Sequence, residues 1–173
     1  MYLVTKKYGH DVGLSATFRQ WRAKDTHCRF LHGYALAVEL TFACSDYQRD
    51  GRGWVINFGG LKEIKQWLCD MFDHKTLVAT DDPALPLFRE MAKIRQEKRD
   101  DELKTYWDEA GQFVQLVEVE AVGCEAFAKM IYDHVGDWVS RQPDLIERGV
   151  SLVKVTVSEH GANSATYFSR PPM

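Results

Sequence analysis

The sequence predicts an α+β fold, in which an antiparallel sheet has two helices packed on one face. Apolar residues alternate with smaller or polar ones over 36–42 and 153–157, as in half-buried strands. Segments 61–72 and 124–142 repeat apolar residues at three- and four-residue steps, as in helices with one apolar face. Strands that pair in sequence, together with two helices that cover them, favour α+β over a doubly wound parallel sheet.

Length and composition indicate one soluble globular domain over 1–173. The chain has 173 residues, of which 45% are hydrophobic and 27% are charged. No apolar run reaches the roughly 18 residues of a membrane span, and the N-terminus has the pattern of a strand rather than of a signal peptide. A net charge of −3 argues against nucleic acid as a partner. The four cysteines are scattered without a C-x-x-C pair, so we expect reduced thiols in the cytoplasm.

The opening segment to Phe18 is expected to form an extended strand or a bulged hairpin. Turn formers over 45–53 predict a reversal, after which residues 54–56 resume an apolar strand that pairs antiparallel with the strand before the turn. Residues 113–119 also have the composition of a strand. A run of charges of both signs at about 80–112 is interpreted as a solvated helical insertion, with a partner-binding surface as the alternative.

The stretch 27–34 is the first candidate for chemistry, because a cysteine and two histidines precede the strand over 36–42. If the extended geometry reaches back through Gly33, the side chains of His32 and Tyr34 share one face of the sheet, with Cys28 nearby. The alternative is a buried cysteine and a hydrogen-bonded histidine without any chemical role.

Several short motifs follow one another in a set order. They are Cys28 with Leu31-His32-Gly33-Tyr34, the segment Gly53 to Lys62, Phe72-Asp73-His74-Lys75-Thr76-Leu77, Glu125, and Val155 to Glu159. Each fragment is weak by itself, but their order and spacing together resemble the 6-pyruvoyl-tetrahydropterin synthases and the related 6-carboxy-tetrahydropterin synthases of queuosine biosynthesis. The resemblance covers most of the chain. It implies the tunnelling fold, in which the sheets of neighbouring subunits join into a closed barrel, as a homo-hexamer or another homo-oligomer.

The same resemblance implies roles for individual residues. In the family, 7,8-dihydroneopterin triphosphate loses triphosphate and its side chain is rearranged or cleaved. Cys28 would be the catalytic base, since a thiolate needs only a lowered pKa. Asp73 would orient His74 as a second acid/base couple. Glu159 would accept hydrogen bonds from the pterin's amino group and ring N–H, and Glu125 is what remains of a second substrate-binding motif.

The metal of the family is the main departure. Family members hold zinc with three histidines, and the corresponding positions here are Phe18, His32 and Tyr34, so that only His32 remains. Catalytic zinc normally takes three protein ligands, and one imidazole with a phenol is a poor zinc site. His10 and His27 are the substitute ligands that the sequence offers. Zinc is therefore the cofactor that the resemblance implies and that the residues present argue against.

Two functions of different class stay open. The first is a lyase of the 6-carboxy-tetrahydropterin synthase type with an altered or absent metal, because Cys28, Asp73, His74 and Glu159 are all retained. The second is a non-catalytic or differently catalytic protein that binds a pterin or purine-like ligand, in which Phe18 and Tyr34 turn a metal pocket into an aromatic one. Fold alone does not decide between them.

Overall fold

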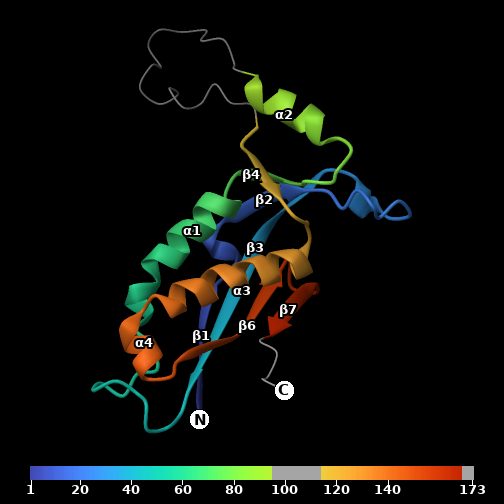
Figure 1. Cartoon of the computed structure of the whole chain (residues 1–173). Helices are drawn as coiled ribbons and strands as arrows, with labels where there is room; N and C mark the ends of the chain where they lie inside the picture. The colour runs from blue at the N-terminus through green and yellow to red at the C-terminus, as the bar shows by residue number, and fades with distance from the viewer. Residues whose placement is uncertain (95–113, 169–173) are drawn as a thin grey trace.

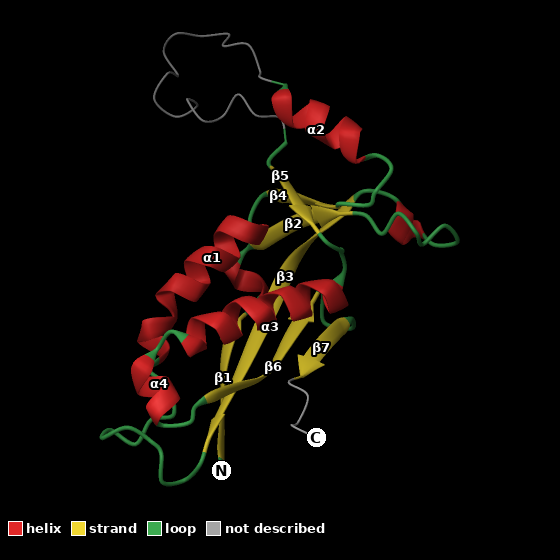
Figure 2. Cartoon of the chain, in the orientation of Figure 1, coloured by secondary structure: helices red, strands yellow, loops and turns green. Residues whose placement is uncertain are grey.

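The computed structural model describes residues 1–94 and 114–168 and confirms the α+β class (Figures 1 and 2). The strands are β1 (Tyr2–Tyr8), β2 (Leu14–Phe18), β3 (His32–Cys44), β4 (Lys75–Ala79), β5 (Leu116–Val119), β6 (Ser151–Ser158) and β7 (Ser164–Phe168). The α-helices are α1 (Lys62–Phe72), α2 (Leu85–Lys93), α3 (Cys124–Ser140) and α4 (Pro143–Glu147). The sheet has the order β5-β4-β2-β3-β6-β7, and β1 pairs with β3.

Strand β3 is the centre of the sheet and is paired along both edges. Strands β1 and β2 follow one another along one edge, from the Tyr2–Cys44 pair to the Phe18–His32 pair. A short turn at 9–13 separates them, and Gly13 adopts a φ of 80° there. Strand β6 pairs antiparallel with the other edge. The predicted extended opening segment is therefore two strands that lie in line.

The sheet is mixed, whereas the sequence predicted antiparallel pairing throughout. Strands β1, β2, β3, β6 and β7 pair antiparallel, but β4 pairs parallel with β2 and with β5. Parallel neighbours need a crossover connection, and a helix usually supplies it. Helix α1 comes directly before β4 in the chain, and α2 lies between β4 and β5.

The predicted strand over 54–56 is wrong, because these residues form an irregular, bent segment that follows the turn. Both edges of β3 are already occupied over this region by β1 and β6, so residues 54–56 cannot pair with β3 as predicted. The Asp50 carboxylate instead accepts the backbone N–H groups of Arg52 and Trp54, each at 2.9 Å. The bond from the Trp54 N–H is the main reason that the pKa of Asp50 is lowered to about 2. The apolar side chains of Val55 and Ile56 are buried without strand pairing.

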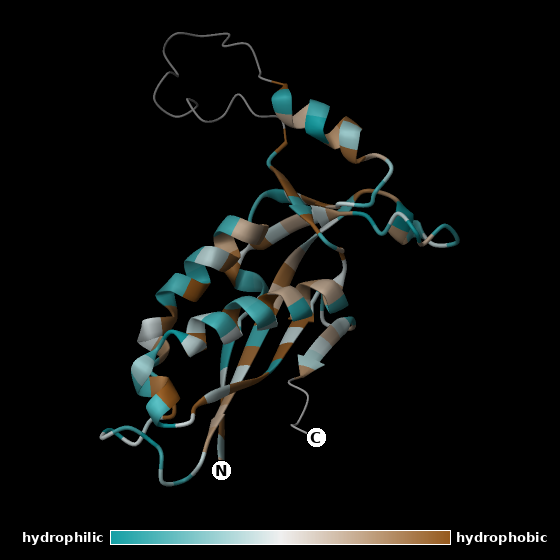
Figure 3. Ribbon diagram, viewed as in Figure 1, coloured by the Kyte–Doolittle hydropathy of each residue, from teal (hydrophilic) through white to brown (hydrophobic). Residues whose placement is uncertain are grey.

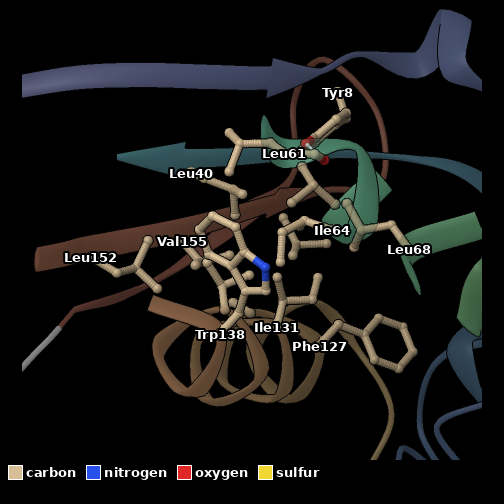
Figure 4. Close-up of a cluster of buried hydrophobic side chains, with 14 of the residues drawn as sticks. Tyr8, Leu40, Leu61, Ile64, Leu68, Phe127, Ile131, Trp138, Leu152 and Val155 are labelled. Carbon is tan, nitrogen blue, oxygen red and sulfur yellow. Dashed lines mark hydrogen bonds between the residues drawn. The ribbon is translucent and has the colours of Figure 1, made fainter. Parts of the chain in front are cut away.

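Helices α1 and α3 cover one face of the sheet, as predicted, and the main core lies between these layers (Figures 3 and 4). Leu40 and Val155 of the sheet and Ile64, Phe127 and Ile131 of the helices are fully buried. Burying each such side chain contributes about 1.5–3 kcal/mol. The helices therefore lie on the sheet through the apolar faces that their periodicity predicted.

A second, smaller core connects α2 to the parallel part of the sheet. Val78, Leu85 and Phe88 are buried together, and Leu116 packs against them. Helix α2 lies in the segment about 80–112 that was predicted as a charged helical insertion, whereas 95–112 lie outside the described residues. In the described part of the chain, no helix is long and apolar enough to cross a membrane.

A buried ion pair joins the end of β2 to the segment after β4. Nε and a terminal nitrogen of the Arg19 guanidinium donate to both oxygens of Asp82, at 2.8 and 2.5 Å. The Asp82 side chain is 1% exposed and that of Arg19 is 26% exposed. The bonds from Arg19 lower the pKa of the Asp82 carboxyl. Asp82 also accepts the Ala84 N–H, at the start of α2.

We expect Asp82→Ala to lower the free energy of unfolding by about 2–3 kcal/mol, because it leaves a partly buried guanidinium without its partner. Because the pKa is lower in the folded state, the pair stabilises the protein above the ordinary carboxyl pKa of about 3.9 and loses this effect as pH falls through the lowered value. Urea unfolding at pH 7 and pH 3 measures both effects.

Asp81→Ala is the matched control. Asp81 pairs with Arg22, but their side chains are 47% and 73% exposed. Such a surface pair contributes less than about 1 kcal/mol. Equal losses in the two variants would contradict the role given to Asp82.

Candidate functional site

Cys28 lies in a short 3-10 turn, His27–Arg29, that folds against the end of β2. The Thr26 hydroxyl accepts the Cys28 N–H at 3.2 Å, and the Cys28 carbonyl accepts the Gln20 N–H at 2.8 Å. The Cys28 side chain is partly exposed and forms no disulfide. The thiol is therefore held in place by its backbone and stays accessible.

An aromatic cluster occupies the beginning of β3, beside this turn. Phe18 pairs with His32 across the strands, so their side chains share a face, and their rings lie 5.5 Å apart. Tyr34 lies 5.3 Å from His32, 6.1 Å from Phe18 and 5.9 Å from His160, measured between ring centroids. The predictions that His32 and Tyr34 share a face and that Phe18 packs beside them are confirmed.

Glu159 comes to the same cluster from the end of β6. Ser158 pairs with Ala37, so the next residue, Glu159, lies diagonally across from Tyr34 on the same face. The pKa of the Tyr34 phenol is raised first by burial, then by the negative charge of Glu159 and, less strongly, by electrostatic interaction with the Cys28 and Cys124 thiols. The structure thus brings the predicted residues Cys28 and Glu159 together around Tyr34.

Cys124 belongs to this candidate site, although its sequence context predicted no role for it. It is the first residue of α3 and is buried, and its thiol lies against Glu159. Burial, followed by the charges of Glu159 and Glu125, raises the pKa of Cys124 to about 12, so its thiol stays protonated. Glu125, in the same helical turn, is exposed beside the cluster. The signal in the sequence was the position of Cys124 next to Glu125 at a helix start.

Gly123 allows α3 to begin this close to the Cys28 turn. It has a φ of 111°, which side chains rarely adopt, and a Cβ there would lie 2.6 Å from Gln20 Nε2. Gln20 is the residue whose N–H is bound by Cys28. A side chain at position 123 would therefore strain the backbone at the start of α3 and displace the end of the Gln20 side chain.

Asp73 and His74 form a second group at the opposite end of β2. The Asp73 carboxylate and His74 Nδ1 lie 2.7 Å apart, and the same carboxylate oxygen accepts the Ser15 N–H at 3.5 Å. His74 has a φ of 56°, a conformation that costs about 1 kcal/mol or more, and its side chain is 81% exposed. The predicted Asp–His couple is therefore present, with the His74 ring open to solvent.

The couple does not meet Cys28 of the same chain. It lies beside Ser15, whereas Cys28 is bonded to Gln20, and five residues of extended chain span roughly 15 Å. Within the described ranges, no hydrogen bond or ion pair joins Cys28 to Asp73 or His74. A single subunit thus carries two separate parts of the predicted catalytic set.

The zinc that the family resemblance implies does not fit these residues. Phe18 is fully buried and packs edge-on against Phe127, 5.2 Å away, so it offers only carbon where a ligand would stand. His32 Nδ1 is bound to the Phe30 carbonyl at 2.6 Å. In the parts of the chain that the structure describes, no three His, Cys, Asp or Glu side chains gather to hold a metal ion.

Neither substitute ligand comes to the cluster. His10 lies in the turn between β1 and β2, where its Nδ1 is 2.5 Å from the Ala35 carbonyl oxygen. His27 stacks on Phe30 at the surface, with ring centroids 6.4 Å apart.

A mixed sheet with two covering helices, and with a cysteine, an Asp–His couple and a glutamate at its ends, defines a protein of the pterin-synthase class with the tunnelling fold. The chain belongs to the 6-pyruvoyl tetrahydropterin synthase family, whose model matches residues 10–170.

Individual relatives agree with this assignment. A 6-carboxy-5,6,7,8-tetrahydropterin synthase from Rickettsia typhi is 39% identical over 56 residues, a match that covers 32% of this chain and 39% of that relative. The 6-pyruvoyl tetrahydropterin synthase of Plasmodium vivax has a TM-score of 0.62 at 18% identity, covering 99% of this chain and 100% of that one. An uncharacterised protein from Wolinella succinogenes has a TM-score of 0.70 at 16% identity, covering 98% of both chains. These structural matches show a shared fold.

We expect added zinc to change the melting temperature of the unmodified protein very little, because a weak ligand stabilises weakly. The double variant Phe18→His with Tyr34→His supplies two more imidazoles beside His32. Its melting temperature should rise with zinc, by the equivalent of about 2–3 kcal/mol at a hundredfold excess over Kd. Differential scanning calorimetry measures both.

Tyr34→His alone is the control, since it still lacks a third ligand. Stoichiometric zinc in the purified parent, found by elemental analysis, would contradict the prediction. So would a double variant whose stability does not depend on zinc.

Proposed function

We propose that the protein is a lyase of the 6-carboxy-tetrahydropterin synthase type, acting on 7,8-dihydroneopterin triphosphate. The observation that carries the proposal is the arrangement of Glu159, Tyr34 and Cys28 around one surface at the ends of β3 and β6. Membership of the family and the name of the Rickettsia typhi relative support the substrate class. Each residue has a chemical task that its position allows.

Glu159 binds the pterin ring in this proposal. A carboxylate has two acceptor oxygens, which match the amino group and the ring N–H of a pterin. The neighbouring Cys124 thiol is kept protonated by burial and by Glu159 itself, so it adds no second negative charge. Glu125 lies one residue further along the same helix start and contributes to the ligand site from there.

Cys28 and the Asp73–His74 couple carry the proton transfers. The thiolate of Cys28 takes a proton from the carbon beside a hydroxyl of the ligand's side chain. The Asp73 carboxylate at His74 Nδ1 fixes the tautomer and leaves Nε2 free to give or take a proton. The exposure of the His74 ring suits a group that works on a ligand held by another subunit.

We place the complete site between subunits of a homo-oligomer, a hexamer in the simplest case. In the described part of the chain, the outer edges of β1 and β7 have no strand partner, and free edges favour closure of the sheet with another copy. A cavity of about 310 Å³ lies beside β1, lined in part by Tyr2, Trp54 and Phe58. These three side chains are 43%, 47% and 43% exposed, as expected of an interface. A small-molecule partner and a cytoplasmic location, favoured by the four free cysteines, complete the proposal.

Glu159→Gln should weaken neopterin binding about 10- to 150-fold, because one acceptor becomes a donor that faces donors; this corresponds to about 1.5–3 kcal/mol for a charged hydrogen bond. Glu120→Gln, an exposed change of the same chemistry, is the control and should leave the affinity unchanged. Titration followed by pterin fluorescence gives both constants. Unchanged affinity in Glu159→Gln would remove Glu159 from the site.

Cys28→Ala and His74→Asn should each abolish release of triphosphate from 7,8-dihydroneopterin triphosphate. Asparagine tolerates the left-handed backbone of position 74, so the fold is kept. If Cys28 and His74 act across subunits, unfolding and refolding the two variants together should restore about a quarter of the parent activity, because random mixing pairs intact groups in that share of sites. No recovery from mixed oligomers would contradict a shared site.

The second candidate is a pterin- or purine-binding protein without this reaction. The observation that favours it is the packing of Phe18 and Tyr34, which makes the centre of the site aromatic. Tight neopterin binding without triphosphate release by the parent protein would decide for this candidate.

A further inference from the structure

We propose that the Tyr34 hydroxyl donates a hydrogen bond to the first side-chain oxygen of the bound pterin, and so selects pterins whose C6 substituent begins with a hydroxylated carbon. The inference rests on the proposed pterin site and adds a residue that determines specificity. Three observations support it: the fixed position of the ring, the free hydroxyl, and the charges around it.

The ring of Tyr34 is held by aromatic neighbours on both its own strand and adjoining segments. His32 packs edge-on at 5.3 Å, and Phe18 and His160 lie at 6.1 and 5.9 Å. Such contacts favour one orientation of the ring over free rotation of the side chain. Tyr34 is partly buried and packs against the main core. Its phenol is thus a group in a defined place.

The hydroxyl of Tyr34 is available to a ligand. Two other tyrosines that pack on the core donate to backbone carbonyls: Tyr8 to Leu61 at 3.3 Å and Tyr132 to Leu152 at 3.1 Å. Over residues 1–94 and 114–168, the Tyr34 hydroxyl makes no hydrogen bond to a protein group. Tyrosine hydroxyls at buried or half-buried positions usually find a partner, and a bound ligand is one that can supply it.

The surroundings make this phenol a donor. Burial and, next, the charge of Glu159 raise the pKa of Tyr34, so the hydroxyl keeps its proton at neutral pH. Glu159 binds the pterin ring in the proposal above, and Cys28 faces the side chain. Glu159 lies diagonally across from Tyr34, and the Cys28 turn comes just before the start of β3, so a ligand that binds between Glu159 and Cys28 lies beside the Tyr34 ring. The oxygen on the first side-chain carbon is the acceptor that such a ligand brings.

The test compares two ligands that differ by one oxygen, 6-hydroxymethylpterin and 6-methylpterin, on the parent protein and on Tyr34→Phe. The parent should bind 6-hydroxymethylpterin about 5- to 10-fold more tightly, which is the gain in affinity expected from one neutral hydrogen bond. Tyr34→Phe keeps the ring and its packing but loses the donor. It should bind both ligands with the affinity that the parent has for 6-methylpterin. Fluorescence titration of all four combinations of protein and ligand gives the coupling between the Tyr34 hydroxyl and the ligand's hydroxyl.

Tyr132→Phe is the matched control, because it removes a tyrosine hydroxyl from the other side of the core and should leave the preference intact. Equal affinity of the parent for the two ligands overturns the proposal even if the variant fails to fold. A preference that survives in Tyr34→Phe overturns it as well. A parent that binds 6-methylpterin without preference refutes the role of Tyr34 alone, whereas a parent that binds neither ligand refutes the proposed pterin site and this inference with it.

Discussion

The rest of the structure depends on the pairing of β3 along both of its edges. The register with β2 and β6 decides which residues face the helices, because side chains alternate across a strand. The alternation that buries Leu36, Val38 and Leu40 also brings Tyr34 and His32 to the same face where the strand begins. A shift of one residue in the pairing register of β3 would expose the core side chains and also move Tyr34 and His32 to the other face of the sheet.

Phe18 shows how closely core and site are combined. Its ring is fully buried against Phe127 of α3, yet it also touches His32 and Tyr34. A metal ligand at this position would be a polar side chain removed from water. Burying it would cost free energy, which metal binding would offset. Phenylalanine at this position contributes apolar packing instead. The polar groups of the cluster are therefore those of its neighbours, His32 and Tyr34. This exchange is the physical reason that the site has aromatic character.

The fold also fixes the separation between the Asp73–His74 couple and Cys28. The couple lies where α1 ends and β4 begins, and its position follows from the parallel pairing of β4 with β2. That pairing keeps it at the far end of β2 from Cys28. The strained backbone of His74 is kept because the neighbouring strands hold it in place. In the proposed function, these two parts meet where subunits contact one another.

The sequence by itself determined the helices α1 and α3, the strands β3 and β6, and the shared face of His32 and Tyr34, because periods of 3.6 and 2 are local properties of a chain. It also predicted Phe18 beside them through the resemblance of its motifs. Only the tertiary structure decided that residues 54–56 do not form a strand, that β4 joins the sheet in parallel, and that Cys124 lies against Glu159. These features depend on which strand edges are already occupied and on contacts between distant segments, and neither leaves a periodic signal in the sequence.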